Sequence, residues 1–297
     1  MVPRLETKWF IEAYEKRNSM NPTLLELAKL DFNKVQAIHQ EDLKYTSRWW
    51  NKTTWDAKLT SLRDRLVECF LWAVAANSLP PFSPLRRILA QVIAMTTTID
   101  DVYDVYGTLD ELEQFTEAIS SGKAYLKEAK WYNSGYTPTL EEYLENAWVS
   151  ISVPLMLTHI SYLTSVTPTE EIMHSMERIE NIIRYSGIIL RLADDLGTYT
   201  DEMARGDNPK AVQCYMHETG ATEEEARMYV TTLILNTWKK LNKERSTILD
   251  SQILKELTDC GANLGRMAQF MYYDEDGHGS RPDITKYHVL SLLVNPI

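Results

Sequence analysis

The feature that most constrains the fold of this chain is the helical spacing of its apolar residues. They recur every three or four positions through one segment after another, as on one face of an α-helix, and no segment alternates convincingly as a strand would. Glycine and proline, 11 of each in 297 residues, are too sparse to interrupt these segments often. The sequence therefore predicts an all-α bundle of about ten helices.

Capping residues, glycines and prolines mark the expected helix ends. Thr139 with Glu142 is expected to begin the helix over residues 139–164, and Pro154 should interrupt that helix near Ser150–Pro154. The segments expected to be helical are residues 4–17, 22–50, 59–76, 84–106, 109–119, 123–133, 139–164, 168–204, 208–219, 223–246, 251–272 and 283–294.

Charge and cysteine content exclude several classes of function. The net charge of −11, without a run of Lys and Arg, argues against a nucleic-acid surface. No stretch of 18 apolar residues predicts a membrane span, and the N-terminus has no signal or transit character, so we expect a soluble protein. Cys69, Cys214 and Cys260 lack metal-ligand spacing and are expected to be reduced core residues.

Three carboxylates, Asp100, Asp101 and Asp104, lie within an apolar stretch of the segment 84–106. On a helix, Asp100 and Asp104 are four positions apart and leave the same face. Two like charges repel, and burial makes them more costly, so a cation is expected between them. The alternative is a solvated acidic patch on a surface helix.

A second cluster, Asp194, Thr198 and Glu202, places three oxygen ligands on one stripe of a helix. Oxygen ligands suit Mg²⁺, and no His or Cys lies at a spacing that would favour zinc. Ion pairing on a helix surface is the alternative. Basic residues that could bind an anion, or pair with nearby carboxylates instead, are Arg63, Arg65, Arg191 and Lys210.

These residues resemble the motifs of a known family. Asp100–Asp104 matches the aspartate-rich DDxxD motif, and Asp194–Glu202 resembles the second metal motif of the C-terminal class I α domain of plant terpene synthases. Arg63–Arg65 is similar to the RxR element of that family, and the stretch from Arg205 to Lys210 fits its continuation. The segment Met271–Gly279 resembles monoterpene synthases more than sesquiterpene synthases.

The resemblance implies a class I isoprenoid synthase helical bundle in which residues 1–297 form one α domain. It also implies that the N-terminal β domain of the family is absent. The interval between the two acidic motifs is several tens of residues shorter than in the family. We therefore expect some family helices to be missing between Ile119 and Lys123, with a shortened joint at residues 120–122.

The implied activity is Mg²⁺-dependent ionisation of a prenyl diphosphate, geranyl diphosphate in the first instance, to a carbocation that yields a monoterpene. Three Mg²⁺ ions, with Mn²⁺ as an alternative, would be held by Asp100, Asp104, Asp194, Thr198 and Glu202. The expected partner is this small molecule, and the family resemblance implies a plastid location.

The resemblance also implies roles for the remaining site residues. Arg63, Arg65, Arg191 and Lys210 would bind the diphosphate, and Asp101 and Asp195 would pair with basic groups. Ile93 and Met156 would shape the pocket, Trp72 would stabilise the cation, and Tyr272 or His278 would remove a proton, unless the released diphosphate does so. From the residues alone, core packing of Trp72 and Met156 and a helix-capping role for Tyr272 and His278 are the alternatives.

Two other functions stay open at this stage. The shortened middle could leave a metal- and diphosphate-binding scaffold or partner subunit that is catalytically impaired. A chain-elongating prenyltransferase is less favoured, because it would carry a second DDxxD motif where this chain has Asp194, Thr198 and Glu202.

Overall fold

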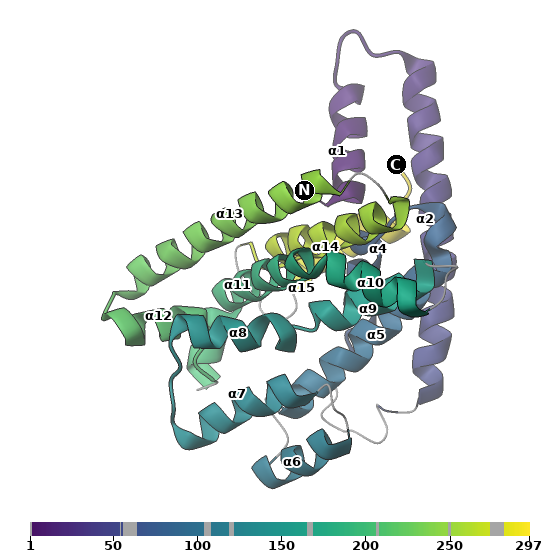
Figure 1. Ribbon diagram of the computed structural model, residues 1–297. Coiled ribbons are helices and arrows are strands. Elements are labelled where there is room, and N and C mark those ends of the chain that lie inside the picture. Colours follow the sequence, from purple (N-terminus) through teal and green to yellow (C-terminus); the bar gives the residue numbers. More distant parts are fainter. Residues whose placement is uncertain are drawn as a thin grey trace.

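All regular elements that the structure describes are helices, as predicted (Figure 1). The computed structural model describes residues 2–53, 55, 64–103, 108–118, 122–164, 169–205, 208–248, 251–273 and 282–297. The elements are α1 (Pro3–Glu15), α2 (Pro22–Thr53), α4 (Leu66–Ala76), η1 (Pro80–Phe82), α5 (Ser83–Asp101), α6 (Leu109–Ala118), α7 (Lys123–Ser134), α8 (Leu140–Ser150), α9 (Val153–Thr164), α10 (Thr169–Arg178), α11 (Glu180–Arg205), α12 (Ala211–Thr219), α13 (Glu223–Thr247), α14 (Gln252–Met271), α15 (Pro282–Val289) and η4 (Leu290–Val294).

The expected helix over residues 168–204 is in fact two helices, α10 and α11. The chain turns at Ile179, whose backbone N–H donates to the carbonyl of Met176 at 3.3 Å. No proline or glycine lies at this turn. The apolar spacing continues across it, so the pattern could not show the break.

The segment 139–164 is interrupted at residues 151–152, within the stretch Ser150–Pro154 where the interruption was expected. Thr139 caps α8 by accepting from the backbone N–H of Glu142, and α8 ends at Ser150. Ser152 then adopts a positive φ of 64°, uncommon for a residue other than glycine, and α9 follows with Pro154 in its first turn. Among the described residues, only Leu140–Thr164 has the length and composition of a membrane span. Its interruption at 151–152 and its packing inside the bundle indicate core helices instead.

Helix α11 lies at the centre of the bundle, where it contacts α8, α9, α13 and α14, while α4 contacts α5 and α14. The main core cluster joins α4, α5, α9, α11 and α14. Gly187 allows α11 to approach α8 closely, because a Cβ added there would lie 2.7 Å from the carbonyl oxygen of Trp148. The three cysteines are buried and free, as predicted.

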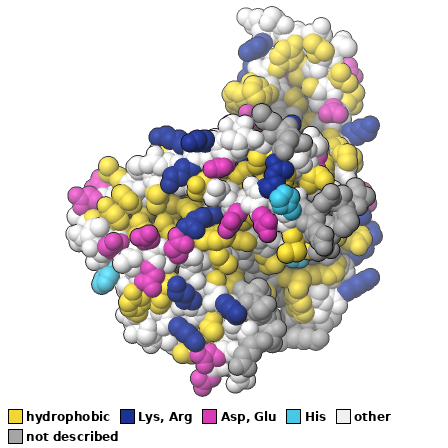
Figure 2. All heavy atoms as spheres, viewed as in Figure 1, with side chains coloured by type: hydrophobic (Ala, Val, Ile, Leu, Met, Phe, Trp, Pro, Cys, Tyr) yellow, Lys and Arg dark blue, Asp and Glu magenta, His cyan; other side chains and the backbone are white. Residues whose placement is uncertain are grey.

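The pair α1 and α2 extends beyond the rest of the bundle (Figure 1). Figure 2 shows hydrophobic side chains on this extension, and Trp9 and Phe10 are more than half exposed. The lower part of α2 is tied to α5 by a buried ion cluster. Both arginines of α5, Arg86 and Arg87, contact the fully buried carboxylate of Asp42 at 2.7–2.9 Å.

Candidate active site

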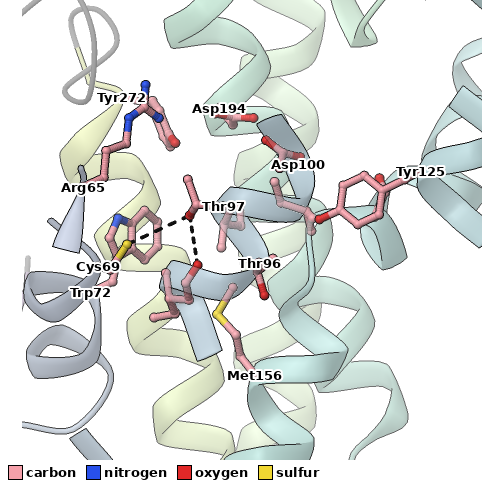
Figure 3. A pocket seen from close by; sticks show the side chains of 14 residues that line it. Arg65, Cys69, Trp72, Thr96, Thr97, Asp100, Tyr125, Met156, Asp194 and Tyr272 are labelled. Atoms are coloured by element: carbon pink, nitrogen blue, oxygen red, sulfur yellow. Dashed lines mark hydrogen bonds between the residues drawn. The ribbon is translucent and has the colours of Figure 1, made fainter. Parts of the chain in front are cut away.

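A cavity of about 130 Å³ opens between α4, α5, α7, the α8–α9 break, α11 and the end of α14 (Figure 3). Its lining combines apolar and polar side chains from segments far apart in the sequence. The lining residues are Arg65, Cys69, Trp72, Ile93, Thr96, Thr97, Asp100, Tyr125, Ser150, Ile151, Met156, Leu190, Asp194 and Tyr272.

The apolar part of the lining contains the residues predicted to shape the pocket. Trp72 on α4, Ile93 on α5 and Met156 on α9 are all less than 10% exposed and line this cavity. Tyr272, at the C-cap of α14, also lines it. The structure therefore brings together four predicted residues from four different helices.

The polar part gathers at one end of the cavity. Asp100 from the last turn of α5 and Asp194 from α11 both line it, and Figure 3 shows them on the same side with Arg65 and Tyr272, whereas Met156 lies at the other end. Asp101 is only 3% exposed and is not among the lining residues. The predicted ligand Asp104 lies outside the described residues, as do Arg63 and His278.

The second acidic motif follows one stripe of α11, as predicted. Thr198 donates its hydroxyl to the carbonyl of Asp194 at 2.9 Å, so its oxygen lone pairs remain available. Glu202 is 9% exposed, and its Oε2 atom is buried without a hydrogen-bond partner in the described part of the molecule. Burial raises the pKa of Glu202 to about 7, although the positive charge of Lys210 opposes this. A buried oxygen in this state is suited to a cation.

The donor set fits a hard divalent cation shared with a phosphate ligand. Mg²⁺ is usually bound by one or two carboxylates, with substrate phosphates and water as further ligands. Within the described ranges, no three His, Cys, Asp or Glu side chains lie close enough to hold a metal ion by themselves. Asp194, Thr198 and Glu202 supply oxygen atoms only, and the orphaned Glu202 oxygen is the observation that favours a cation there.

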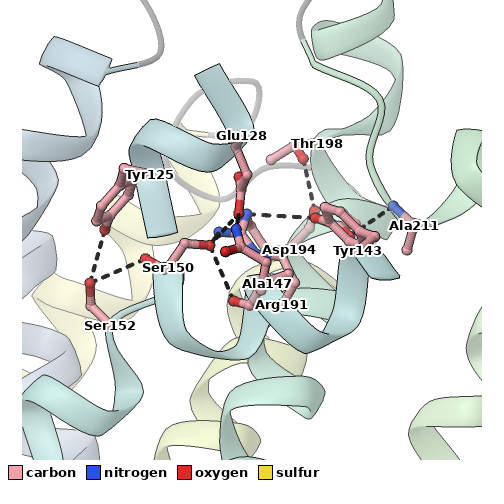
Figure 4. A network of polar contacts seen from close by, with 12 residues as sticks. Tyr125, Glu128, Tyr143, Ala147, Ser150, Ser152, Arg191, Asp194, Thr198 and Ala211 are labelled. Atoms are coloured by element: carbon pink, nitrogen blue, oxygen red, sulfur yellow. Dashed lines mark hydrogen bonds and ion pairs between the residues drawn. The ribbon is translucent and has the colours of Figure 1, made fainter. Parts of the chain in front are cut away.

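Beside this stripe, Arg191 belongs to a buried polar network (Figure 4), and the carboxylate of Asp195 is part of the same network. Asp195 is fully buried and accepts from the Tyr143 hydroxyl at 2.9 and 3.0 Å and from the backbone N–H of Ala211 at 3.1 Å. Burial raises its pKa to about 6, although the charge of Arg191 opposes this. Arg191 lies 3.7 Å from Asp195 and 3.4 Å from Asp194.

Three of the four basic side chains predicted to bind an anion, Arg65, Arg191 and Lys210, are described and lie in the same region. Arg65 lines the cavity from the N-cap of α4, and Lys210 lies at the N-cap of α12, where it is 4% exposed. The buried Nε of Arg191 has no hydrogen-bond partner in the part of the chain that the structure describes. A guanidinium with a spare donor at the edge of an acidic site is suited to a diphosphate that carries metal ions.

Sequence reasoning missed several members of the network. The residues not predicted to belong to the site are Glu128 on α7, Tyr143 and Asn146 on α8, and Ser150 at the end of α8. Ser150 is one bound of the interruption expected near Ser150–Pro154, a signal that could have directed attention to its side chain. Nothing in the sequence distinguishes Glu128 from the exposed glutamates of other helices.

Models of two terpene synthase domain families match this chain. "Terpene synthase family, metal binding domain" matches residues 51–121, and "Terpene synthase family 2, C-terminal metal binding" matches residues 122–240. Together they cover more than half of the chain, and they meet at the predicted joint.

Curated relatives of this chain are terpene synthases too. R-linalool synthase QH5, chloroplastic, from Artemisia annua is 51% identical over 346 aligned positions, which cover 100% of this chain and 59% of the relative. (-)-alpha-Terpineol synthase from Vitis vinifera is 46% identical, and the match covers 100% of this chain and 58% of that relative. The chain thus spans about three fifths of the length of these relatives. The alignments are longer than its 297 residues, so the relatives carry positions without a counterpart here.

Solved structures share the fold. A limonene synthase bound to 2-fluorolinalyl diphosphate gives a TM-score of 0.90 at 39% identity, covering 97% of this chain and 62% of that one. Isoprene synthase from grey poplar leaves, in complex with three Mg²⁺ ions and dimethylallyl-S-thiolodiphosphate, gives a TM-score of 0.89 at 37% identity. The match covers 99% of this chain and 65% of that one. The helical bundle is therefore the class I isoprenoid synthase fold. The chain belongs to the terpene synthase family and corresponds to its C-terminal, metal-binding domain.

Proposed function

We propose that this chain is the catalytic domain of a monoterpene synthase, a lyase that ionises geranyl diphosphate and releases a monoterpene and diphosphate. The observation that carries the proposal is the placement of Asp100 and Asp194, from two different helices, at one end of an otherwise largely apolar cavity. The limonene synthase structure holds a prenyl diphosphate analogue, and the curated relatives make linalool and terpineol.

In this proposal Asp100, Asp104, Asp194, Thr198 and Glu202 would hold the metal ions. The isoprene synthase structure contains three Mg²⁺ ions, and we propose the same number here, with Mn²⁺ as an alternative. When bound, the ions neutralise the diphosphate and stabilise the charge that develops on it as the C–O bond breaks.

The basic residues then bind and orient the leaving group. Arg63, Arg65, Arg191 and Lys210 donate to diphosphate oxygens, which supplies charge stabilisation in the transition state. Asp195, whose carboxylate lies 3.7 Å from Arg191, balances the charge of that guanidinium, and Asp101 pairs in the same way with a basic group.

The apolar end of the cavity accommodates the hydrocarbon and excludes water, which would otherwise quench the carbocation. The indole face of Trp72 stabilises the cation, a contribution of about 0.5–2 kcal/mol for a cation–π contact. Ile93 and Met156 shape the pocket around the hydrocarbon. Tyr272, His278 or the released diphosphate accepts the proton that is lost when the product forms.

We further propose that residues 1–297 act as one α domain with a shortened joint at 120–122, and that the protein works in plastids. The meeting of the two family models between residues 121 and 122 and the excess length of the alignments support the joint. The chloroplastic designation of R-linalool synthase QH5 from Artemisia annua supports the location.

The test is an assay of the purified protein with Mg²⁺ and either geranyl or farnesyl diphosphate, with volatiles analysed by gas chromatography. The proposal predicts C10 volatiles from geranyl diphosphate and loss of product on chelation of Mg²⁺. In parallel, Mg²⁺ with inorganic diphosphate should raise the melting temperature.

Each other outcome has a distinct meaning. A raised melting temperature without any volatile would indicate a binding scaffold instead of an enzyme. A longer prenyl diphosphate, formed in the presence of isopentenyl diphosphate, would indicate a prenyltransferase. Absence of both product and thermal shift would contradict the proposal outright.

A further inference from the structure

Helix α7 contributes a buried carboxylate that the proposed mechanism does not use. Glu128 is only 4% exposed, and its Oε1 accepts from the Ser150 hydroxyl at 2.5 Å and from the Asn146 amide at 3.0 Å. A buried carboxylate is costly unless it is hydrogen-bonded and faces positive charge. The positive charge reached through this network is that of Arg191.

The connection passes through a single hydroxyl group (Figure 4). Ser150 has one proton, which it donates to Glu128, and its oxygen accepts from Nη2 of Arg191 at 3.2 Å. A hydroxyl that donates to a carboxylate is a better acceptor, because hydrogen bonds in a chain polarise one another. Glu128 therefore strengthens the bond between Ser150 and Arg191.

Few other contacts orient the guanidinium. Its Nη1 lies 3.4 Å from Asp194 and 3.7 Å from Asp195, both long for a charge-assisted hydrogen bond. Its Nε is buried and has no hydrogen-bond partner in the described ranges. The contact with Ser150, which itself lines the cavity, is thus the shortest that Arg191 makes among those measured.

We propose that Glu128 is a positioning residue that, through Ser150, orients Arg191 toward the diphosphate. The inference rests on the proposed function, because it takes Arg191 to be a diphosphate ligand. Glu128 itself touches neither substrate nor metal in this account. Its effect reaches the substrate only through the direction in which Arg191 presents its remaining donors.

A second contact between the same helices indicates that α7 is held in register with the α8–α9 break. The Tyr125 hydroxyl lies 2.9 Å from that of Ser152, the residue with positive φ, and Asn146 also donates to the carbonyl of Ala124 at 2.9 Å. Tyr125 and Glu128 are three residues apart and so share one face of α7. The side chain of Glu128 is therefore placed by a fixed backbone, as a positioning role requires.

The experiment measures the affinity of the full chain for inorganic diphosphate in saturating Mg²⁺ by calorimetry. The variants are Ser150→Ala, which removes the connecting hydroxyl, and Glu128→Gln, which keeps the shape and removes the charge. Each should weaken binding about tenfold, as expected for loss of a hydrogen bond involving a charged group. The matched control is Ser161→Ala, which removes a hydroxyl that is equally buried but belongs to α9, donates to the carbonyl of Thr158 and does not line the cavity; it should change the affinity by less than about twofold.

A double-mutant cycle separates positioning from structural support. In an Arg191→Lys background, which keeps the charge and loses the planar fork, Ser150→Ala should have no further effect on diphosphate affinity. Melting temperatures confirm that each variant is folded at the assay temperature, and Ser150→Ala alone carries the test if Glu128→Gln does not fold.

Wild-type affinity in both Ser150→Ala and Glu128→Gln would overturn the inference and leave the proposed function standing. So would an equal loss in the control Ser161→Ala, or a loss in Ser150→Ala that persists undiminished in the Arg191→Lys background. Failure of the wild-type protein to bind Mg²⁺ and diphosphate would instead contradict the proposed function, and the inference with it.

Discussion

Gly197 of α11 lies directly against Tyr272 at the end of α14. A Cβ added at Gly197 would be 2.7 Å from the Cβ of Tyr272 and 3.1 Å from its Cα and its carbonyl oxygen. The 2.7 Å contact is shorter than a Cβ atom tolerates, and the two at 3.1 Å are tight, so glycine permits an approach that a larger residue would not. The consequence is that a side chain lining the cavity is held in place by the backbone of the helix that carries Asp194.

We expect Gly197→Ala to displace Tyr272 and thereby to change the reaction. The backbone of Tyr272 must move, because two of the three crowded atoms belong to the backbone. Overpacking of this kind costs about 1–3 kcal/mol in stability. Denaturant unfolding measures that cost, and the ratio of terpene products measures the altered cavity.

The control for this prediction is Gly261→Ala, where the added Cβ would lie 2.9 Å from the hydroxyl oxygen of Ser186. Neither of these residues lines the cavity. Gly261→Ala should lose stability without a change in product ratio. Identical product ratios in Gly197→Ala and the wild type would show that Tyr272 has no influence on the reaction.

The buried cluster around Asp42 should dominate the attachment of α2 to α5. Both Asp42 and Arg86 have side chains that are 0% exposed, and Arg86 also donates to the carbonyl of Leu79 at 2.6 Å. Arg86→Met leaves a buried carboxylate short of its main partner, a change that typically costs about 3–5 kcal/mol. The midpoint of guanidinium-induced unfolding should fall accordingly.

Arg87→Met is the matched comparison, because Arg87 contacts the other oxygen of Asp42 and its side chain is 32% exposed. It should cost clearly less than Arg86→Met, since the solvent-exposed partner of an ion pair contributes less. Equal losses in the two variants would contradict the importance assigned to burial.

His39 should make stability depend on pH. Burial, and secondarily the positive charge of Arg86, lowers its pKa to about 4, from an ordinary value of 6.5. Between these values the unfolded chain binds the proton and the folded chain does not, so stability decreases as the pH falls from 6.5 to 4. The loss attributable to this group is up to about 3 kcal/mol.

The measurement is the free energy of unfolding of the wild type and of His39→Gln at several values between pH 7 and pH 4. Carboxylates titrate in both proteins, so the difference between the two curves isolates His39. We expect the curve of His39→Gln to be less steep over this interval. Parallel curves would show that His39 is protonated in the folded protein with an ordinary pKa.

Much of the helical architecture could be predicted, because apolar periodicity and capping residues act locally. The prediction placed Trp72, Ile93, Met156 and Tyr272 in one pocket through the family resemblance, and all four line the same cavity. The break at Ile179 could not be predicted, since no breaker residue stands there and the apolar spacing continues.

The polar network behind the site could not be predicted either. Whether Glu128 is exposed or buried depends on which helix covers α7, and that is decided by tertiary packing. The same holds for Tyr143, whose hydroxyl contacts Asp195 across 52 residues of sequence. Motifs identify the groups that bind the ligand, whereas the groups that orient them carry no local pattern.

The central claim is that the two acidic motifs act together on a prenyl diphosphate. Its most direct test is the rate of monoterpene formation from geranyl diphosphate and Mg²⁺ by Asp100→Ala and Asp194→Ala. The control is Asp201→Ala, which alters a half-buried carboxylate on the same helix as Asp194 that does not line the cavity. We predict a loss of at least about 10²-fold in turnover for each of the first two variants, the effect of removing one charge-stabilising group, and near wild-type turnover for the third. Near wild-type turnover in either Asp100→Ala or Asp194→Ala would contradict the account.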